Sequence, residues 1–273
     1  MIEARPVLIV AAKELRDRLR NRWVLAVALV FTVFALVIAY FGGAQQGAVG
    51  LRSTEATIAS LVSLVIYLIP LIALLLGFDA VVGEAERGTL DLVLAMPITR
   101  LELLLGKYLG LAAALSLSTL CGFGLVALML GAQAGKAALE PYGGFLVSSV
   151  LLGLVFLSLA VMVSVLAADR ARASGLAIAL WFFFVLVYDL LLLGLLVTSG
   201  GEVGGDVFPY LLLLNPADVF RILNVFSLEE VKNLYGLAGI VPAPLAKPWL
   251  MALVMLGWIA APLGVATWRF RSS

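Results

Sequence analysis

Residues 79–100 read Asp79-Ala-Val-Val-Gly-Glu-Ala-Glu-Arg-Gly-Thr-Leu-Asp-Leu-Val-Leu-Ala-Met-Pro-Ile-Thr-Arg100, and they separate two long apolar segments. Those segments, Ile58 to Phe78 and Leu103 to Gly131, are each long enough to cross a bilayer, which takes about 20 residues of helix. Most of the rest of the chain is apolar, so this charged loop is where the protein can offer polar groups to a soluble partner. The loop is therefore the first candidate for a functional element.

The composition is that of a chain whose solvent is lipid. The 273 residues are 63% hydrophobic and 13% charged, whereas a soluble domain carries about 25% charged residues. A net charge of +1, with no basic patch, gives no indication of nucleic-acid binding. Histidine is absent, which removes the commonest general base and transition-metal ligand. The single cysteine, Cys121, excludes an internal disulfide.

The apolar segments predict an all-α integral membrane protein with six transmembrane helices in a single domain, residues 1–273. The first segment follows a basic region, but it is too long for the core of a signal peptide, so we expect it to remain as a span. The apolar patch Tyr210 to Leu214 is too short to cross and is expected at the outer surface. The six predicted spans are Trp23 to Phe41, Ile58 to Phe78, Leu103 to Gly131, Phe145 to Ala167, Gly175 to Val197 and Trp249 to Trp268.

The positive charges predict the orientation. With six spans both termini lie on one side, and that side collects 13 of the 18 lysines and arginines. The positive-inside rule places this side in the cytoplasm. The loop at residues 79–102 then faces the cytoplasm, and residues 198–248 face outward.

Residues 1–22 are expected to form a basic helix in the membrane interface. Pro6 suits a first helical turn, and an apolar face is predicted from Leu8, Ala12, Leu15 and Leu19 at helical spacing. Such a helix rests among lipid headgroups and would turn into the first span at Arg22-Trp23. The alternative is a charge cluster that serves only to set the topology.

Within the loop, a short amphipathic helix is predicted after Gly88. Thr89 is expected to cap it, and Asp91 in the first turn agrees with the helix dipole. Pro97 should end it near Met96, because the residue before a proline avoids helical geometry. The result would be a rigid rod at the membrane surface that another protein can push. An ordinary solvated turn is the alternative.

The loop resembles the signature of ABC-2 type transporter permeases. The resemblance rests on Gly83-Glu84-x-Glu86-Arg87-Gly88-Thr89-Leu90, on Leu94 to Arg100 and on Gly106-Lys107-Tyr108. The segment Ala12 to Trp23 is similar to the interfacial elbow helix of the same family. Six spans with cytoplasmic termini also fit, so the resemblance covers the whole chain.

The resemblance implies that the loop is a coupling helix seated in a groove of an ATPase subunit. The residues expected to contact that subunit are Gly83, Glu84, Glu86, Arg87, Gly88, Thr89, Leu90, Met96 and Pro97. Neither Gly-Lys pair of the chain has the spacing of a phosphate-binding loop. ATP and magnesium are therefore expected on a separate ATPase dimer, with no cofactor and no catalytic residue in this chain. Because such ATPases work in pairs, the chain is expected to be a homodimer.

A narrower resemblance points to the permease subunits that serve nitrous-oxide reductase maturation. It rests on Thr57 to Leu61, on Trp181-Phe182 with Tyr188-Asp189, and on Asn215 to Arg221. It implies a bacterial inner membrane, a cytoplasmic ATPase and a periplasmic solenoid-type protein that assists assembly of a copper centre. The residues expected to contact the periplasmic partner are Asn215, Pro216, Asp218, Phe220 and Arg221.

Asp189 is an ionisable residue about fifteen residues into the fifth span, and such residues are functional candidates by default. It could face a dimer interface, pair with Arg221, or reach headgroup water through helix tilt. Asp79, at the inner end of the second span, is expected to anchor the loop. Met251 and Met255 share a helical face, but two thioethers make a poor copper site, so they are expected to fill gaps in the core. No metal site is predicted.

Residues 198–248 are expected to form short helices that cap the dimer and grip the periplasmic partner, or else a lid without a partner. In such helices, Asp218 and Arg221 would share one face.

The predicted function is a membrane subunit that couples cytoplasmic ATP hydrolysis to nitrous-oxide reductase maturation and copper delivery on the periplasmic side, by conformational transmission. The alternatives are an ABC-2 exporter of a lipid, drug or peptide, a passive scaffold, and an intramembrane enzyme. An enzyme is disfavoured because Asp79 and Asp189 are expected at opposite membrane faces.

Overall fold

The computed structural model describes residues 3–41, 54–135, 139–200, 207–225 and 247–272. Those residues contain helices and connecting turns but no strand. Six of the helical segments are long and apolar enough to cross a membrane: Trp23–Phe41, Thr54–Glu86, Arg100–Ala132, Leu139–Leu166, Arg170–Thr198 and Pro248–Ser272. The predicted all-α, six-span architecture is confirmed; each predicted segment lies inside one of these helical regions, except that the fourth was predicted to end at Ala167, one residue beyond the helix.

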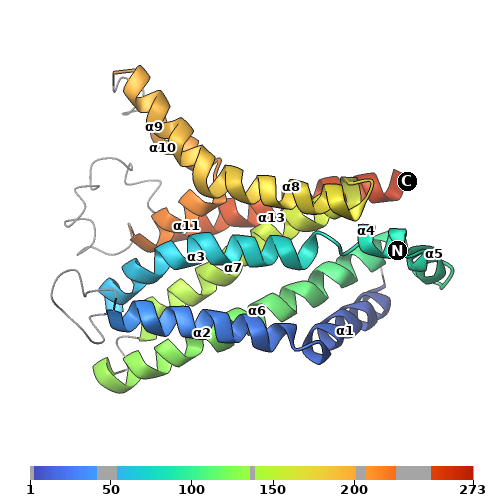
Figure 1. Ribbon diagram of the computed structural model, residues 1–273, viewed down its shortest axis with the longest axis horizontal. Coiled ribbons are helices and arrows are strands. Elements are labelled where there is room, and N and C mark those ends of the chain that lie inside the picture. The colour runs from blue at the N-terminus through green and yellow to red at the C-terminus, as the bar shows by residue number, and fades with distance from the viewer. Residues whose placement is uncertain (1–2, 42–53, 136–138, 201–206, 226–246, 273) are drawn as a thin grey trace.

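Both termini lie at the same end of the helix bundle (Figure 1), which is called the inner end below. The opposite, outer end carries the starts of α3, α7 and α13. The elements are α1 (Ala4–Arg20), α2 (Trp23–Phe41), α3 (Thr54–Gly77), α4 (Val82–Glu86), α5 (Thr89–Leu94), α6 (Arg100–Ala134), α7 (Leu139–Leu166), α8 (Arg170–Phe182), η3 (Phe183–Val187), α9 (Tyr188–Thr198), α10 (Phe208–Leu212), α11 (Pro216–Val225) and α13 (Pro248–Ser272).

Helix α7 forms the centre of the bundle. It packs against α3, α6, α11 and α13, and 67% of its most apolar stretch is buried, against 22% for the fifth span. Phe156 and Leu157 on α7 are fully buried. On α13, Met251 and Met255 are also fully buried in this core, which confirms that they act as packing residues.

Helix α1 and the first span both pack on α6, and glycines of α6 make room for them. A Cβ atom on Gly106 would lie 2.6 Å from the Val10 Cβ, and one on Gly110 would lie 2.6 Å from the Ala11 carbonyl oxygen. Small residues four apart let two helices approach closely. This glycine pair therefore fixes α1 against the inner half of α6.

The expected apolar face of α1 lies away from α6. Leu8 is 63% exposed and Leu19 is 42% exposed, whereas the side chains that α1 buries are Val7 and Glu14. An exposed apolar face is available to the lipid interface. Burial of a carboxylate on the packed face was not predicted. After α1 the chain turns at Arg22, which has a left-handed φ of 54°.

The fifth span is interrupted and leans away from the bundle. It consists of α8, the π-helical turn η3 and α9, and α9 diverges from the other helices (Figure 1). Single π-helical turns occur mostly inside α-helices and often mark functional sites. Here the turn separates an inner arm, α8, from an outer arm, α9.

Candidate functional site

The charged loop folds into two short helices, α4 and α5, at the inner end of the bundle (Figure 1). Gly88 joins them with a left-handed φ of 68°, a conformation that glycine adopts without steric cost. The prediction that Thr89 caps the second helix is wrong. Thr89 is already helical, and its hydroxyl donates to the Glu84 carbonyl oxygen at 3.2 Å, which joins α5 to α4 instead. The helix ends at Leu94, shortly before Pro97 as expected.

Helix α5 buries none of its residues, and the loop exposes apolar side chains. Leu92 is 70% exposed and Met96 is 55% exposed. Leu92 was not among the predicted contact residues, although an apolar residue inside a charged loop could have indicated it. The predicted contact residues divide by environment. Glu86, Arg87, Gly88, Thr89, Met96 and Pro97 are exposed, Glu84 and Leu90 are half-buried, and Gly83 is buried.

A buried ion cluster joins the loop to α1 and α6. The Lys107 ammonium lies 2.7 Å from a Glu84 carboxylate oxygen and 3.2 Å from one of Glu14. The Lys107 side chain is only 3% exposed, and those of Glu14 and Glu84 are 9% and 13% exposed. One cation on α6 thus binds a carboxylate from α1 and another from α4. These three residues are called the Lys107 cluster below.

Lys13 lies at the edge of the cluster and supplies a second positive charge, so that two cations face the two carboxylates. Its ammonium lies 3.0 Å from the Glu14 carboxylate and 3.9 Å from that of Glu84. Burial by itself would raise the pKa of Glu14, but the charges of Lys107 and Lys13 hold that pKa below its ordinary value. Glu14 is therefore held in its ionised form.

A second, more exposed contact joins the other side of the loop to α8. The Arg170 guanidinium donates to the Asp79 carboxylate at 3.1 Å, and the Arg170 backbone N–H donates to the Glu86 carboxylate at 2.7 Å. Asp79 therefore anchors the loop, as expected. Between the two contacts, the Ser164 hydroxyl oxygen accepts the backbone N–H groups of Val81 and Val82, at 2.9 and 3.1 Å. The loop is therefore held by α1 and α6 on one side and by α8 on the other, and its apolar residues Leu92 and Met96 stay exposed.

Comparison with known sequences accords with this arrangement. Residues 8–273 match the sequence profile of the ABC-2 family transporter proteins. This chain belongs to the ABC-2 family. Two similar proteins are both called probable ABC transporter permease protein NosY. One, from Pseudomonas aeruginosa, is 46% identical over 268 residues, and the other, from Stutzerimonas stutzeri, is 45% identical over 270 residues; both alignments cover 96% of each chain. The chain is a permease subunit of an ABC transporter.

At the outer end of the permease, Asn215 starts α11 and ties it to the fifth span. The Asn215 side-chain oxygen accepts the Ala217 N–H at 3.0 Å, so Asn215 caps α11, which begins at Pro216. Its amide nitrogen donates to the Phe184 carbonyl oxygen at 2.9 Å. That carbonyl belongs to η3, so Asn215 fixes α11 to the π-helical turn.

Most of the residues expected to contact a periplasmic partner are buried in this chain. Asn215 and Phe220 are fully buried, and Asp218 is 1% exposed. Of the predicted five, Arg221 is the one with a partly exposed side chain, and Pro216 is buried. These residues position α11, and the side chains exposed near it belong to α10 and the turn after it, chiefly Tyr210 and Leu214.

Arg221 holds two carboxylates together. Its guanidinium lies 3.1 Å from the Asp189 carboxylate on α9 and also binds Asp218 on its own helix. The pairing of Asp189 with Arg221, one of the predicted alternatives, is present. Asp79 is bound to Arg170 and Asp189 to Arg221, so the two carboxylates are held by different cations and do not form a catalytic pair.

Replacing Arg221 with glutamine is expected to destabilise the outer end by about 1–3 kcal/mol, because it leaves Asp218 buried without its cation. Burial already raises the pKa of Asp218 above its ordinary value, and Arg221 opposes that rise. An acid whose folded-state pKa is raised stabilises the fold below its unfolded pKa, near 4, and loses that stability as pH rises towards the folded value. At pH 5 Asp218 is protonated in the folded state and does not need the cation, whereas at pH 8 it is ionised. The destabilisation caused by Arg221→Gln should therefore be larger at pH 8 than at pH 5. Thermal unfolding of the purified permease at both pH values measures it, and an equal loss would contradict this account.

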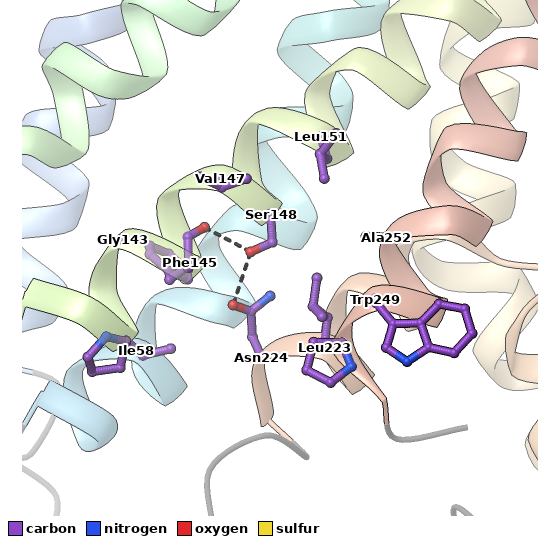
Figure 2. Close-up of a pocket in the computed structure, with 13 residues that line it drawn as sticks. Ile58, Gly143, Phe145, Val147, Ser148, Leu151, Leu223, Asn224, Trp249 and Ala252 are labelled. Atoms are coloured by element: carbon purple, nitrogen blue, oxygen red, sulfur yellow. Dashed lines mark hydrogen bonds between the residues drawn. The ribbon is translucent and has the colours of Figure 1, made fainter. Parts of the chain in front are cut away.

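An apolar cavity of about 590 Å³ opens at the outer end between α7, α11 and α13. Figure 2 shows Trp249 and Leu223 beside it and the glycine-containing turn of α7 opposite. Its polar wall is Ser148, whose hydroxyl lies 2.9 Å from the Phe145 carbonyl oxygen and 3.1 Å from the Asn224 side-chain oxygen. A cavity of this size and polarity suits a small apolar molecule or an acyl chain.

Proposed function

We propose that a separate ATPase binds the α4–α5 loop of this permease and that the permease converts its nucleotide cycle into movement of the spans. The observation that carries the proposal is the exposure of Leu92 and Met96 on a loop held to α1, α6 and α8. Apolar side chains on a rigid element are typical anchors of a protein interface. The chain itself then takes no catalytic part.

The proposed orientation places both termini and the α4–α5 loop in the cytoplasm and the whole chain in the bacterial inner membrane. It follows from the charge asymmetry, because the inner end carries most of the lysines and arginines. The proposed assembly is a homodimer of this chain on an ATPase dimer, so that each ATPase subunit receives one loop.

The work proposed for this assembly is nitrous-oxide reductase maturation, with copper delivery on the periplasmic side. Two features support it. The segments Thr57 to Leu61 and Asn215 to Arg221 resemble permeases of that process, and the two relatives are both called NosY. Transmission of movement, rather than passage of a copper ion, fits the packing role of Met251 and Met255. The proposed periplasmic partner, a solenoid-type protein, would dock over α10 and the exposed part of Arg221.

Replacing Leu92 with aspartate should abolish binding of the ATPase, because it places a charge at the centre of the proposed contact without touching the core. Copurification of the ATPase with tagged permease measures this. Arg271→Glu, on an exposed residue at the same end of the molecule, is the matched control and should retain binding. Retention of the ATPase by Leu92→Asp would reject the loop as the docking element. Arg87→Glu is expected to uncouple the ATPase, and unchanged transport-linked activity in that variant would reject the role of the loop.

The same variants test the physiological role. In cells whose own copy of the gene is deleted, nitrous-oxide reductase should be made without its full copper content, and wild-type permease or Arg271→Glu should restore the copper. Leu92→Asp should not restore it. Copper analysis of the purified reductase is the readout. Full copper content in the deletion strain would refute the maturation role while leaving the docking result intact.

The second candidate function is export of a lipid, drug or peptide, and the apolar cavity at the outer end favours it. The deletion strain separates the two functions. Export predicts a normally metallated reductase and a cellular substrate that accumulates.

A further inference from the structure

The loop is held by two contacts that differ in burial. On one side, Glu84 enters the Lys107 cluster, in which every side chain is at least 87% buried. On the other side, Asp79 and Glu86 bind Arg170, whose side chain is 45% exposed. Breaking a buried ion pair costs much more than breaking an exposed one. If the loop moves, the Arg170 contact is therefore the one that changes, while the Lys107 cluster keeps the loop on α1 and α6.

The helix on the exposed side is lightly packed. Helix α8 buries only two small residues, Ala173 and Ala177. Beneath the Arg170 contact lies a small apolar cluster separate from the main core, made of Val82, Val163 and Ala173. Weakly buried elements have low local stability and are the ones that move. The Trp181 indole N–H donates to the Tyr67 carbonyl oxygen of α3 at 3.0 Å and holds the outer end of α8. The structure thus allows the inner end of α8 to shift relative to α7.

The middle of the fifth span is fixed. The Phe184 ring in η3 packs edge-on against Phe156 of α7 at 5.9 Å and against Trp258 of α13 at 5.6 Å between ring centroids. The Phe184 carbonyl also accepts the Asn215 amide. A span that is loose at its inner arm and held at its middle can pivot there.

The outer arm of the span is bound to the outer helices. The Tyr188 hydroxyl donates to the Leu211 carbonyl at 2.6 Å, and Asp189 binds Arg221 at 3.1 Å. Rotation of α9 about η3 therefore pulls on α10 through Tyr188 and on the exposed Arg221 side chain through Asp189. The fifth span connects the inner loop with the outer helices through side-chain contacts at both ends.

Resting on the function proposed above, we infer that the fifth span is a lever with its pivot at η3, and that Arg170 is the positioning residue through which the α4–α5 loop drives it. Movement of the loop changes the Asp79–Arg170–Glu86 contact and swings α8. The rotation of α9 then shifts α10, the surface over which a periplasmic protein would dock.

Arg170→Ala tests the lever in the purified permease–ATPase complex. With Cys121 replaced by serine, a cysteine is placed at Tyr210, which is 59% exposed on α10. The probe is a membrane-impermeant maleimide, and its labelling rate is measured without nucleotide and with ATP plus vanadate, which traps the ATPase with ADP bound. In the otherwise unchanged permease the rate should depend on nucleotide. Arg170→Ala removes the ion pair with Asp79 but keeps the bond from the backbone N–H of residue 170 to Glu86. Its labelling rate should therefore depend much less on nucleotide, although the ATPase copurifies in normal amount.

Further variants test whether the reduced nucleotide response comes from the broken ion pair or from general damage to α8. Arg172→Ala, two residues along α8, removes an arginine that pairs only with Asp169 in the part of the chain that the structure describes, and it should keep the nucleotide response. The reciprocal exchange Asp79→Arg with Arg170→Asp restores an ion pair and should restore the response. Should Arg170→Ala fail to express, Asp79→Asn carries the same expectation.

The outcomes distinguish the two proposals. A full nucleotide response in Arg170→Ala overturns the lever alone. Absence of ATPase from the otherwise unchanged permease overturns the proposed function, because the loop then has no driver.

Discussion

Replacing Lys107 with methionine is expected to lower the free energy of unfolding by about 3–5 kcal/mol, the cost of removing one partner from a buried ion pair. Methionine has nearly the length of lysine, so the packing is kept and the charge is lost. Glu14 and Glu84 would then face each other with side chains that are 9% and 13% exposed. Unfolding of the purified permease in mixed detergent micelles measures the change.

The matched control for this prediction is Lys13→Met. Lys13 touches the same two carboxylates, but its side chain is 57% exposed, and exposed ion pairs contribute about 1 kcal/mol or less. Neutralising both carboxylates with Glu14→Gln and Glu84→Gln in the Lys107→Met background should recover most of the loss. If Lys107→Met and Lys13→Met destabilise equally, the cluster has no special role.

Replacing Gly110 with leucine is expected to displace α1 and to cost about 3 kcal/mol, at the upper end of the usual range for overpacking. A Cβ atom there would lie 2.6 Å from both the Ala11 carbonyl oxygen and the Glu14 Cβ. Backbone cannot yield at that distance, so α1 must move, and Glu14 would be drawn away from Lys107. The same unfolding measurement detects it.

Gly124→Leu is the control for Gly110→Leu, since Gly124 lies on the same helix and no neighbouring atom lies within 4 Å of a Cβ placed there. This change should be neutral or slightly stabilising, because leucine is a better helix former than glycine. Destabilisation of the same size by both variants would show that the effect is not the contact with α1.

The six spans could be predicted from the sequence because lipid requires long apolar helices, and composition alone reveals them. The loop could be found because its charges stand out between Phe78 and Leu103. Its detailed capping could not, because either Gly88 or Thr89 could precede the first turn of α5. In the structure Gly88 does so, and the Thr89 hydroxyl bonds to the nearby Glu84 carbonyl.

The Lys107 cluster could not be predicted, because its members come from three elements and Glu14 is 93 residues from Lys107. No local pattern marks such a contact. The π-helical turn was also missed, since the residues of Phe183–Val187 are ordinary apolar ones whose register is set by Asn215 and the surrounding rings. Part of the predicted outer region, residues 201–206 and 226–246, lies outside the described residues.

The burial of Glu14 against α6 imposes an order on biosynthesis. Helix α1 leaves the ribosome well before Lys107 exists, and an ionised carboxylate without a cation is too costly to bury. Until the third span has been inserted, α1 must remain in the hydrated headgroup layer, and only then can it dock. Helix α1 therefore reaches its final place only after the third span, although it is synthesised before the first.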